Sequence, residues 1–312
     1  MTIQPETTAF VFPGQGSQVL GMGKDLAGAY PVAAEIFAQA DQILGFALTQ
    51  IAWQGPEEDL NDTLNTQPAL LTHSVAALRV FQERNPGFRP AYVAGHSMGE
   101  LSALVACGTL PFAAALKLAR ERGRLMKQAG EVNPGGMAAI LGLDILTLES
   151  ICAAASTMDE IVQVANDNCP GQVVISGASA ALDRAVSAAQ KAGARRAMRL
   201  AVSIAAHSPL MAHAQQAFNQ AVNAAPFVEP ALPLVGNVAA TPLVTADAIR
   251  ADLQGQLNSR VRWTESVQWM AAQGVTAFVE LGTGSVLGGL IKRIARDAVG
   301  LAAGNPADFD KI

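Results

Sequence analysis

The sequence has few cysteines and no long apolar run. Cys107, Cys152 and Cys169 lie in apolar or turn contexts without the spacing of metal ligands. This argues against a disulfide framework and for a reducing compartment. No apolar run is long enough to cross a bilayer, and no cleavable signal is recognisable. We therefore expect a cytoplasmic protein with no membrane partner and no metal.

Positive charge and aromatic residues are also scarce. The formal net charge is −5, from 21 Lys and Arg against 26 Asp and Glu. A general nucleic-acid surface is therefore not expected, and an acidic partner would need a local basic patch. Half of the residues are hydrophobic but only 5% are aromatic. A chain of 312 residues suits one large domain with an insertion, or two domains.

One short motif, Gly95-His96-Ser97-Met98-Gly99-Glu100, gives the clearest chemical signal. Residues 91–94 before it predict a buried strand, and residues 101–107 after it predict a helix. A G-x-S-x-G in this context is the signature of a nucleophile elbow, whose flanking glycines permit the tight turn. The N–H groups that open the helix would face an oxyanion. The motif predicts Ser97 as a nucleophile and His96 as structural; the alternative is a tight turn with an ordinary serine.

A second glycine-rich segment, Pro13–Gln18, follows the short apolar strand Thr8–Phe12. Loops at the carboxyl ends of strands are where α/β sheets place ligands. Both phosphate-loop patterns fail, because one needs glycine where Val19 stands and the other needs glycine where Gln18 stands. The loop instead offers free backbone N–H groups, which face the elbow if the two strands are neighbours.

Prolines and glycines mark the predicted helix limits. Pro68 is expected to open one helix, and Pro111 to start another that Gly130 ends. Arg122 shares an apolar stripe of the second helix with other residues at helical spacing: Ala115, Ala119 and Met126. A guanidinium there is costly unless an anion meets it. Two interpretations are open: a structural ion pair with a buried carboxylate, or a bidentate clamp for a substrate carboxylate.

The pattern of elements changes between residues 135 and 202. The predicted order strand–helix–strand–strand–helix–strand is that of a ferredoxin-like split βαβ unit: strands 137–141, 161–165, 172–176 and 195–202, with helices 147–155 and 181–192. We expect an α/β fold in which residues 1–132 and 203–312 form a large subdomain with a parallel-sheet core. Residues 133–202 form a small inserted subdomain over the serine. The tail from Ala302 is expected to fray.

His207 is the best candidate for a general base among the four histidines. It opens a predicted helix and follows the nucleophile in the order of an α/β-hydrolase-like arrangement. His73 is expected to be a packed or surface residue, and His213 lies off the helical face of His207. No carboxylate nearby is an obvious third triad member, so a backbone carbonyl is expected to orient the imidazole.

Over residues 8–300 the chain resembles the malonyl-CoA:acyl-carrier-protein transacylases. The resemblance rests on motifs that occur in the same order: Phe12–Gln18, Gly95–Glu100, Arg122-Gly123, His207-Ser208-Pro209 and Glu280-Leu281-Gly282. It implies an α/β-hydrolase-like large subdomain with a ferredoxin-like insertion. It also implies transfer of malonyl from malonyl-CoA to the phosphopantetheine thiol of acyl carrier protein, without a cofactor. The implied roles are Ser97 as acylated nucleophile, His207 as base, Gln15 and Met98 as oxyanion N–H donors, Arg122 as holder of the malonyl carboxylate, Gln67 and Gln172 as site-lining residues, and Gln256 as the carbonyl partner of His207.

One residue departs from the family pattern. Many malonyl-selective members have phenylalanine just before the histidine, whereas this chain has Ala206. A smaller residue could enlarge the acyl pocket and admit methylmalonyl, so acyl selectivity is open. The pathway is open too, because related acyltransferases serve fatty-acid synthesis, polyketide synthases and malonate decarboxylases. A monomer is the expected state.

Two other functions are compatible with parts of the sequence. A serine hydrolase or thioesterase would share the elbow and the histidine, but the buried arginine and the missing triad acid count against it. A non-catalytic carrier-protein docking subunit is opposed by the intact serine, histidine and arginine. Docking of an acidic carrier protein would need basic residues, and two local pairs are candidates: Arg195 with Arg196, and Lys292 with Arg293.

Overall fold

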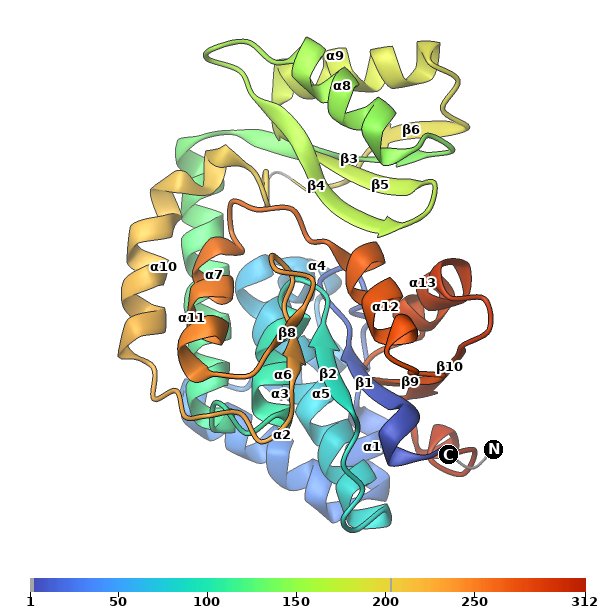
Figure 1. Cartoon of the computed structure of the whole chain (residues 1–312). Coiled ribbons are helices and arrows are strands. Elements are labelled where there is room, and N and C mark those ends of the chain that lie inside the picture. The colour runs from blue at the N-terminus through green and yellow to red at the C-terminus, as the bar shows by residue number, and fades with distance from the viewer. Residues whose placement is uncertain (1–2, 203) are drawn as a thin grey trace.

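The computed structural model describes residues 3–202 and 204–312, and it contains a larger and a smaller sheet (Figure 1). The larger sheet has the order β10-β9-β1-β2-β7-β8, and its strands are parallel except for the β7–β8 pair. Its strands are β1 (Thr8–Phe12), β2 (Tyr92–Gly95), β7 (Leu234–Val235), β8 (Pro242–Leu243), β9 (Ala277–Leu281) and β10 (Val299–Ala303).

Helices cover both faces of this sheet because its strands are apolar on both sides. On β1, Phe10 and Phe12 belong to one buried cluster, whereas Ala9 and Val11 belong to another. This alternation is the period of a strand. The helices of the large part are α1 (Lys24–Ala29), α2 (Pro31–Leu44), α3 (Leu48–Gln54), α4 (Glu57–Asn61), α5 (Thr63–Arg84), α6 (Gly99–Ala106), α7 (Phe112–Val132), α10 (Ala212–Ala224), α11 (Ala246–Gly255), α12 (Trp263–Ala272) and α13 (Val286–Ile294), with the 3₁₀ turns η1 (Pro5–Thr7), η2 (Pro209–Met211) and η3 (Pro306–Asp308).

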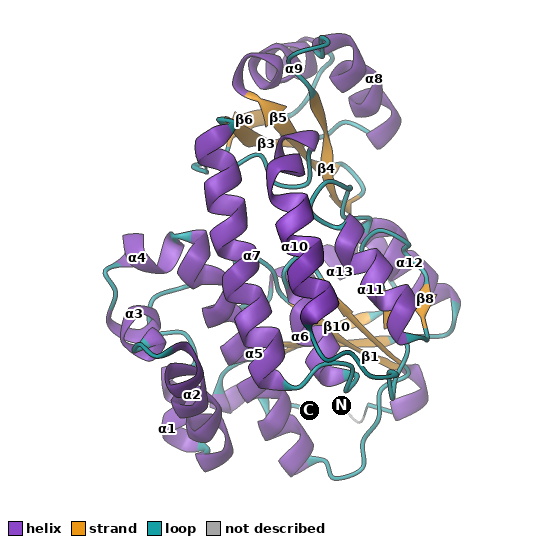
Figure 2. Ribbon diagram, turned by 90° about the vertical axis from the view of Figure 1, so that its left-hand side faces the viewer, coloured by secondary structure: helices purple, strands orange, loops and turns teal. Residues whose placement is uncertain are grey.

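The smaller sheet has the order β4-β5-β3-β6 with all pairs antiparallel. Its elements are β3 (Gly135–Leu141), α8 (Ile145–Ala155), β4 (Val162–Cys169), β5 (Gln172–Ala178), α9 (Ser179–Lys191) and β6 (Arg196–Arg199). α8 and α9 pack on its outer face, and α7 and α10 run side by side toward it (Figures 1 and 2). The α/β fold and the ferredoxin-like strand order are as predicted. The predicted junction at residue 203 lies outside the described residues.

The predicted start of a helix at Pro68 is wrong, because α5 begins at Thr63 and contains this proline. Asp62 caps the helix by accepting a hydrogen bond from the N–H of Leu64. Proline cannot donate to the carbonyl four residues earlier. That carbonyl, of Leu64, instead accepts from Arg120 Nη1 on α7 at 2.7 Å. A side chain from another helix therefore compensates for the missing N–H.

Two further limits predicted from single residues are also wrong. Gly130 lies inside α7, which continues to the exposed Val132, because a single glycine weakens a helix without ending it. The tail from Ala302 is ordered, because β10 pairs in parallel with β9 and Phe309 is buried. In the tail, packing outweighs local propensity.

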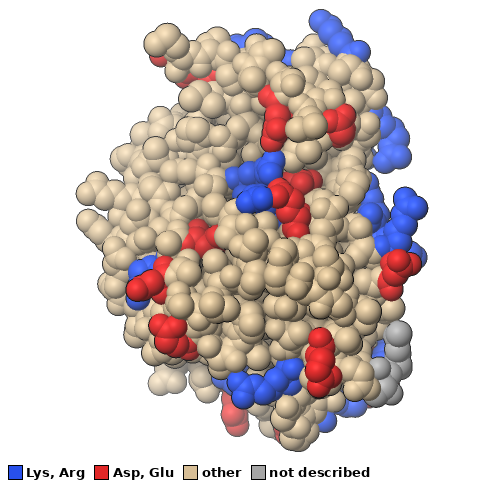
Figure 3. Space-filling model, in the orientation of Figure 1, with Lys and Arg blue, Asp and Glu red and all other residues tan. Residues whose placement is uncertain are grey.

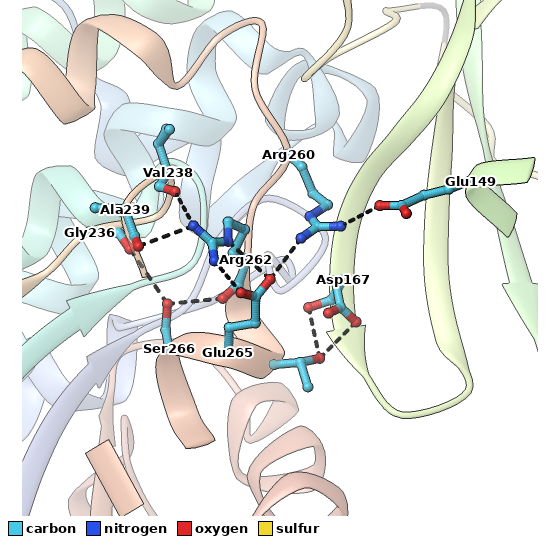
Figure 4. Close-up of polar contacts among 10 residues, drawn as sticks. Glu149, Asp167, Gly236, Val238, Ala239, Arg260, Arg262, Glu265 and Ser266 are labelled. Carbon is cyan, nitrogen blue, oxygen red and sulfur yellow. Dashed lines mark hydrogen bonds and ion pairs between the residues drawn. The ribbon is translucent and has the colours of Figure 1, made fainter. Parts of the chain in front are cut away.

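The loop between α11 and α12 joins the two sheets. Val261 forms a parallel bridge with β4, donating to the carbonyl of Ala165 at 2.8 Å and accepting from the N–H of Asp167 at 3.0 Å. Beside it, Arg260 forms ion pairs with Glu149 of α8 at 2.8 Å and with Glu265 of α12 at 2.7 Å (Figure 4). Backbone hydrogen bonds and an ion pair thus connect the small subdomain to the loop that follows Gln256.

Candidate active site

Ser97 occupies a strained turn between β2 and α6. Its φ is 51°, a left-handed conformation that is rare outside glycine. A Cβ added at Gly95 would lie 2.0 Å from the carbonyl carbon of Gly99, and one added at Gly99 would lie 2.2 Å from the carbonyl oxygen of Phe12. The turn therefore requires both glycines of the motif. The geometry is that of a nucleophile elbow.

His207 lies against the serine, as the sequence predicts for a base. Its Nε2 is 2.7 Å from Ser97 Oγ, and its Nδ1 is 2.9 Å from the carbonyl oxygen of Gln256. Because a carbonyl only accepts, Nδ1 carries the proton and Nε2 is free to accept from the serine hydroxyl. Burial and the nearby Arg122 guanidinium lower the pKa of His207 to about 3. The imidazole is thus neutral at neutral pH, as a base must be.

Arg122 is 1% exposed and its guanidinium faces the serine. Nη1 donates to Gln67 Oε1 at 2.9 Å, and Nη2 donates to Gln256 Oε1 at 2.8 Å and to Ser97 Oγ at 3.2 Å. Within residues 3–202 and 204–312, no carboxylate lies within ion-pair distance of it. Burial lowers the pKa of Arg122 to about 10, so it keeps its charge at neutral pH. The direct ion pair that the sequence left open is absent from this part of the chain.

The two predicted oxyanion donors lie on adjacent loops. β1 and β2 are parallel neighbours, with Phe12 opposite Gly95, as the sequence interpretation required. A Cβ at Gly14 would be 2.5 Å from the carbonyl oxygen of His96, so the first loop packs on the elbow. Among the described residues, the backbone N–H groups of Gln15 and Met98 donate to no other group. Both are therefore free to bind an oxyanion.

Two buried residues of the site were not predicted. Asn237 accepts from the N–H of Ser97 through Oδ1 at 2.8 Å. Glu100 is fully buried and accepts from the side chains of Asn237 and Gln256. Glu100 stands inside the elbow motif, so its position was available in the sequence. Asn237 lies in a turn 140 positions away along the chain and carries no local signal.

Other predicted residues lie elsewhere or serve packing. Gln172 is not part of the cluster, since its Oε1 accepts from Arg293 at 2.7 Å. His96 is near Asn168, with 2.8 Å between Nε2 and Oδ1. His73 is buried between Thr283 and the carbonyl of Gly304. In the described ranges there is no cluster of three metal-ligating side chains, and no helix is long and apolar enough to cross a membrane.

Comparison with known proteins identifies the family. The model of the acyl transferase domain matches residues 9–303. The malonyl CoA-acyl carrier protein transacylase of Haemophilus influenzae is 45% identical over 304 residues, covering 97% of each chain. An acyl carrier protein S-malonyltransferase structure from Vibrio cholerae has a TM-score of 0.94 at 43% identity, covering 98% of this chain and 99% of that one.

A further solved structure contains a partner. It is a malonyl-transacylase in complex with a type II PKS acyl-carrier protein, with a TM-score of 0.94 at 44% identity and 98% of each chain covered. The predicted resemblance is thereby confirmed over nearly the whole chain. This chain belongs to the acyl transferase domain family and, within it, to the malonyl CoA-acyl carrier protein transacylases.

Proposed function

We propose that this protein transfers the malonyl group of malonyl-CoA to the phosphopantetheine thiol of an acyl carrier protein, through an ester on Ser97. The observation that carries the proposal is the buried Arg122, whose Nη2 lies 3.2 Å from Ser97 Oγ. In the described part of the chain only neutral groups bond to it. A buried cation beside a nucleophile favours an acyl group that ends in a carboxylate. The names of the relatives support the same donor and acceptor.

In the first half-reaction, His207 Nε2 accepts the proton of Ser97 as Oγ attacks the thioester carbonyl. The carbonyl oxygen becomes an oxyanion and is bound by the N–H groups of Gln15 and Met98. The intermediate then collapses, the carbon–sulfur bond breaks, and the CoA sulfur leaves with the proton from His207. Arg122 holds the malonyl carboxylate throughout, which fixes the acyl group at the serine.

In the second half-reaction, the thiol of the carrier protein replaces CoA. His207 accepts the thiol proton as the sulfur attacks the ester carbonyl of malonyl-Ser97. The same N–H groups bind the second oxyanion, and collapse returns the proton to Ser97 Oγ. The carbonyl of Gln256 holds the imidazole in the required tautomer at 2.9 Å, so a serine–histidine dyad suffices. Gln67 lines the site and holds one side of the guanidinium.

We propose that the carrier protein docks on a basic edge of the molecule. Lys292, Arg293 and Arg296 line a hollow of about 520 Å³ next to Pro170. Arg195 lies against Gly142, whose N–H donates to the carbonyl of Gly171 in the β4–β5 turn at 2.9 Å. Because Gly171 is next to Pro170, Arg195 approaches the same edge. In Figure 3, Lys and Arg gather along the right-hand edge at the height of α13 and β6. Such a patch suits an acidic partner.

The test of the function is the mass of the intact protein after incubation with malonyl-CoA and then with carrier protein. We expect one malonyl adduct, which carrier protein removes with formation of malonyl-carrier protein. Ser97→Ala should carry no adduct, because no other side chain in the described residues combines the elbow with the histidine. An adduct of normal yield on the alanine variant would refute the assignment of Ser97.

The same experiment separates the two alternative functions. A serine hydrolase or thioesterase would release free malonate at a rate that carrier protein does not change. A non-catalytic docking subunit would bind carrier protein without forming the adduct. Methylmalonyl-CoA in place of malonyl-CoA reports the effect of the small Ala206 on acyl selectivity.

Three further parts of the proposal concern the whole molecule. We take residues 1–132 with 203–312 and residues 133–202 as its two subdomains, which limited proteolysis can test. Free, buried thiols at the three cysteines support a reducing compartment such as the cytoplasm. A monomer is the proposed state, and light scattering at increasing protein concentration measures it.

A further inference from the structure

Glu100 is a buried carboxyl group for which the proposed reaction has no chemical step. It is the last residue of the elbow motif and the second residue of α6, and it is 0% exposed. Burial raises the pKa of this carboxyl well above its usual range, and the Asp252 carboxyl adds to the rise. Burial of a carboxyl group is unfavourable unless hydrogen bonds compensate for the lost hydration, so its contacts indicate its role.

The contacts of Glu100 converge on one of its oxygens. Oε2 accepts from Gln256 Nε2 at 2.8 Å, from the backbone N–H of Asn237 at 3.3 Å, and from Asn237 Nδ2. Oε1 is buried and has no partner among the described residues. Oε2 can accept these bonds whether the carboxyl is ionised or carries a proton on Oε1. Its role as acceptor therefore does not depend on its charge.

Each of the two amides that bond to Glu100 has a donor end and an acceptor end. Glu100 Oε2 accepts from Asn237 Nδ2 and from Gln256 Nε2, so the oxygen of each amide points away from Glu100. Asn237 Oδ1 then accepts from the N–H of Ser97 at 2.8 Å. Gln256 Oε1 accepts from Arg122 Nη2 at 2.8 Å, while its Nε2 also donates to the carbonyl of Ser97 at 3.1 Å.

We propose that Glu100 is a positioning residue that sets the orientation of the Asn237 and Gln256 amides, and through them the placement of Ser97 and Arg122. This inference rests on the proposed function. The Asn237 amide accepts from the N–H of Ser97, so the N–H groups of Gln15 and Met98 remain to bind the oxyanion. The Gln256 amide presents its neutral oxygen to the guanidinium of Arg122.

The Gln256 amide, which lies between Glu100 and Arg122, explains how the buried Arg122 guanidinium stays available to substrate. A carboxylate in direct contact with Arg122 would form an ion pair and compete with the malonyl carboxylate. With Gln256 between them, the two groups are not in contact, and Glu100 in its ionised form raises the pKa of Arg122 from a distance. The amide takes one Nη2 hydrogen bond without neutralising the group.

Two variants separate the acceptor role from the charge and from mere packing. Glu100→Gln removes the charge but can keep an oxygen at the position of Oε2, whereas Glu100→Met keeps a similar length and has no acceptor. In the methionine variant, we expect acylation by malonyl-CoA to slow by about tenfold to a hundredfold, the range for a small misplacement of reacting groups. We also expect its preference for malonyl-CoA over acetyl-CoA to fall, because Arg122 loses its fixed position.

The glutamine variant should retain several times more activity than the methionine variant. Equal losses in the two variants, or an unchanged malonyl-to-acetyl ratio in a folded methionine variant, would overturn the inference. A purely structural role would lower thermal stability and slow both acyl-CoAs alike. Formation of the Ser97 adduct in the wild-type protein tests the proposed function separately.

A third variant covers the case in which Glu100→Met does not fold. Asn237→Ala removes the hydrogen bonds of this amide to Ser97, Glu100 and the carbonyl of Gly95, and it leaves the bond between Gln256 and Arg122. In folded protein of unchanged thermal stability, it should slow acylation by malonyl-CoA and acetyl-CoA by the same factor and leave their ratio unchanged, whereas a purely structural role would lower the stability as well. Unaltered acylation rates in this variant would overturn the inference as well.

Discussion

Replacement of Arg122 by alanine is the sharpest test of the proposed acyl selectivity. The substitution removes the guanidinium from its place 3.2 Å from Ser97 Oγ. It leaves the bond between Ser97 and His207 in place, because neither residue depends on Arg122 for its backbone position. The nucleophile and base should therefore still react, but without a group that binds the malonyl carboxylate.

The size of the effect follows from the kind of contact that is lost. A hydrogen bond to a charged group contributes about 1.5–3 kcal/mol, and more when its partner is left buried and unpaired. The loss in kcat/KM for malonyl-CoA should thus be about tenfold to a few hundredfold. Acetyl-CoA has no carboxylate, so its kcat/KM should fall less or even rise. Desolvation of an unpaired malonyl carboxylate adds to the difference.

The assay is kcat/KM for both acyl-CoAs on a variant whose folding is verified by its circular dichroism and thermal unfolding. Arg124→Ala is the matched control, because Arg124 lies on the exposed face of the same helix and pairs with Glu121. The control should leave the malonyl-to-acetyl ratio unchanged. If Arg122→Ala also left that ratio unchanged while lowering both rates, Arg122 would be a structural residue and the clamp would be refuted.

Three further predictions follow from the charges and the packing. Added salt should weaken transfer to carrier protein more than self-acylation, and charge reversal at Lys292 and Arg293 should do the same; equal salt responses would contradict a basic docking edge. Since the pKa of His207 is lowered to about 3, the unfolded chain binds a proton below about pH 6.5 that the folded chain does not, and stability falls as pH falls from there toward 3. Urea unfolding should show that loss as about 2 kcal/mol at about pH 5, less in His207→Gln. Ala206→Phe should lower methylmalonyl turnover relative to malonyl, measured in competition; an unaltered ratio would place Ala206 outside the acyl pocket.

The elbow and the ferredoxin-like insertion could be predicted from the sequence because their signals are local. A tight turn needs glycine on both sides of Ser97, and alternating apolar residues specify strands. The buried stripe that contains Arg122 was equally visible at helical spacing. These features depend on neighbours along the chain, and the structure agrees with them.

The predictions that failed, and the site residue that was not predicted, depend on segments that are distant along the chain. Pro68 was expected to start a helix, but Arg120 from another helix satisfies the carbonyl that this proline leaves free. The tail beyond Ala302 is ordered by pairing with β9, which lies at the other side of α13 in the chain. Asn237 joins the site only because β7 is the parallel neighbour of β2. A single sequence does not show which distant segments meet.

The bridge between Val261 and β4 has a kinetic consequence. The loop that contains Val261 begins at Gln256, whose carbonyl orients the imidazole of His207. A swing of the small sheet away from the large one would break two backbone hydrogen bonds and disturb that carbonyl. We therefore expect CoA to leave and the carrier-protein thiol to enter without a swing of the small sheet. The Ser97 ester makes turnover ping-pong, and with the small sheet held in place neither half-reaction should wait for a lid to close.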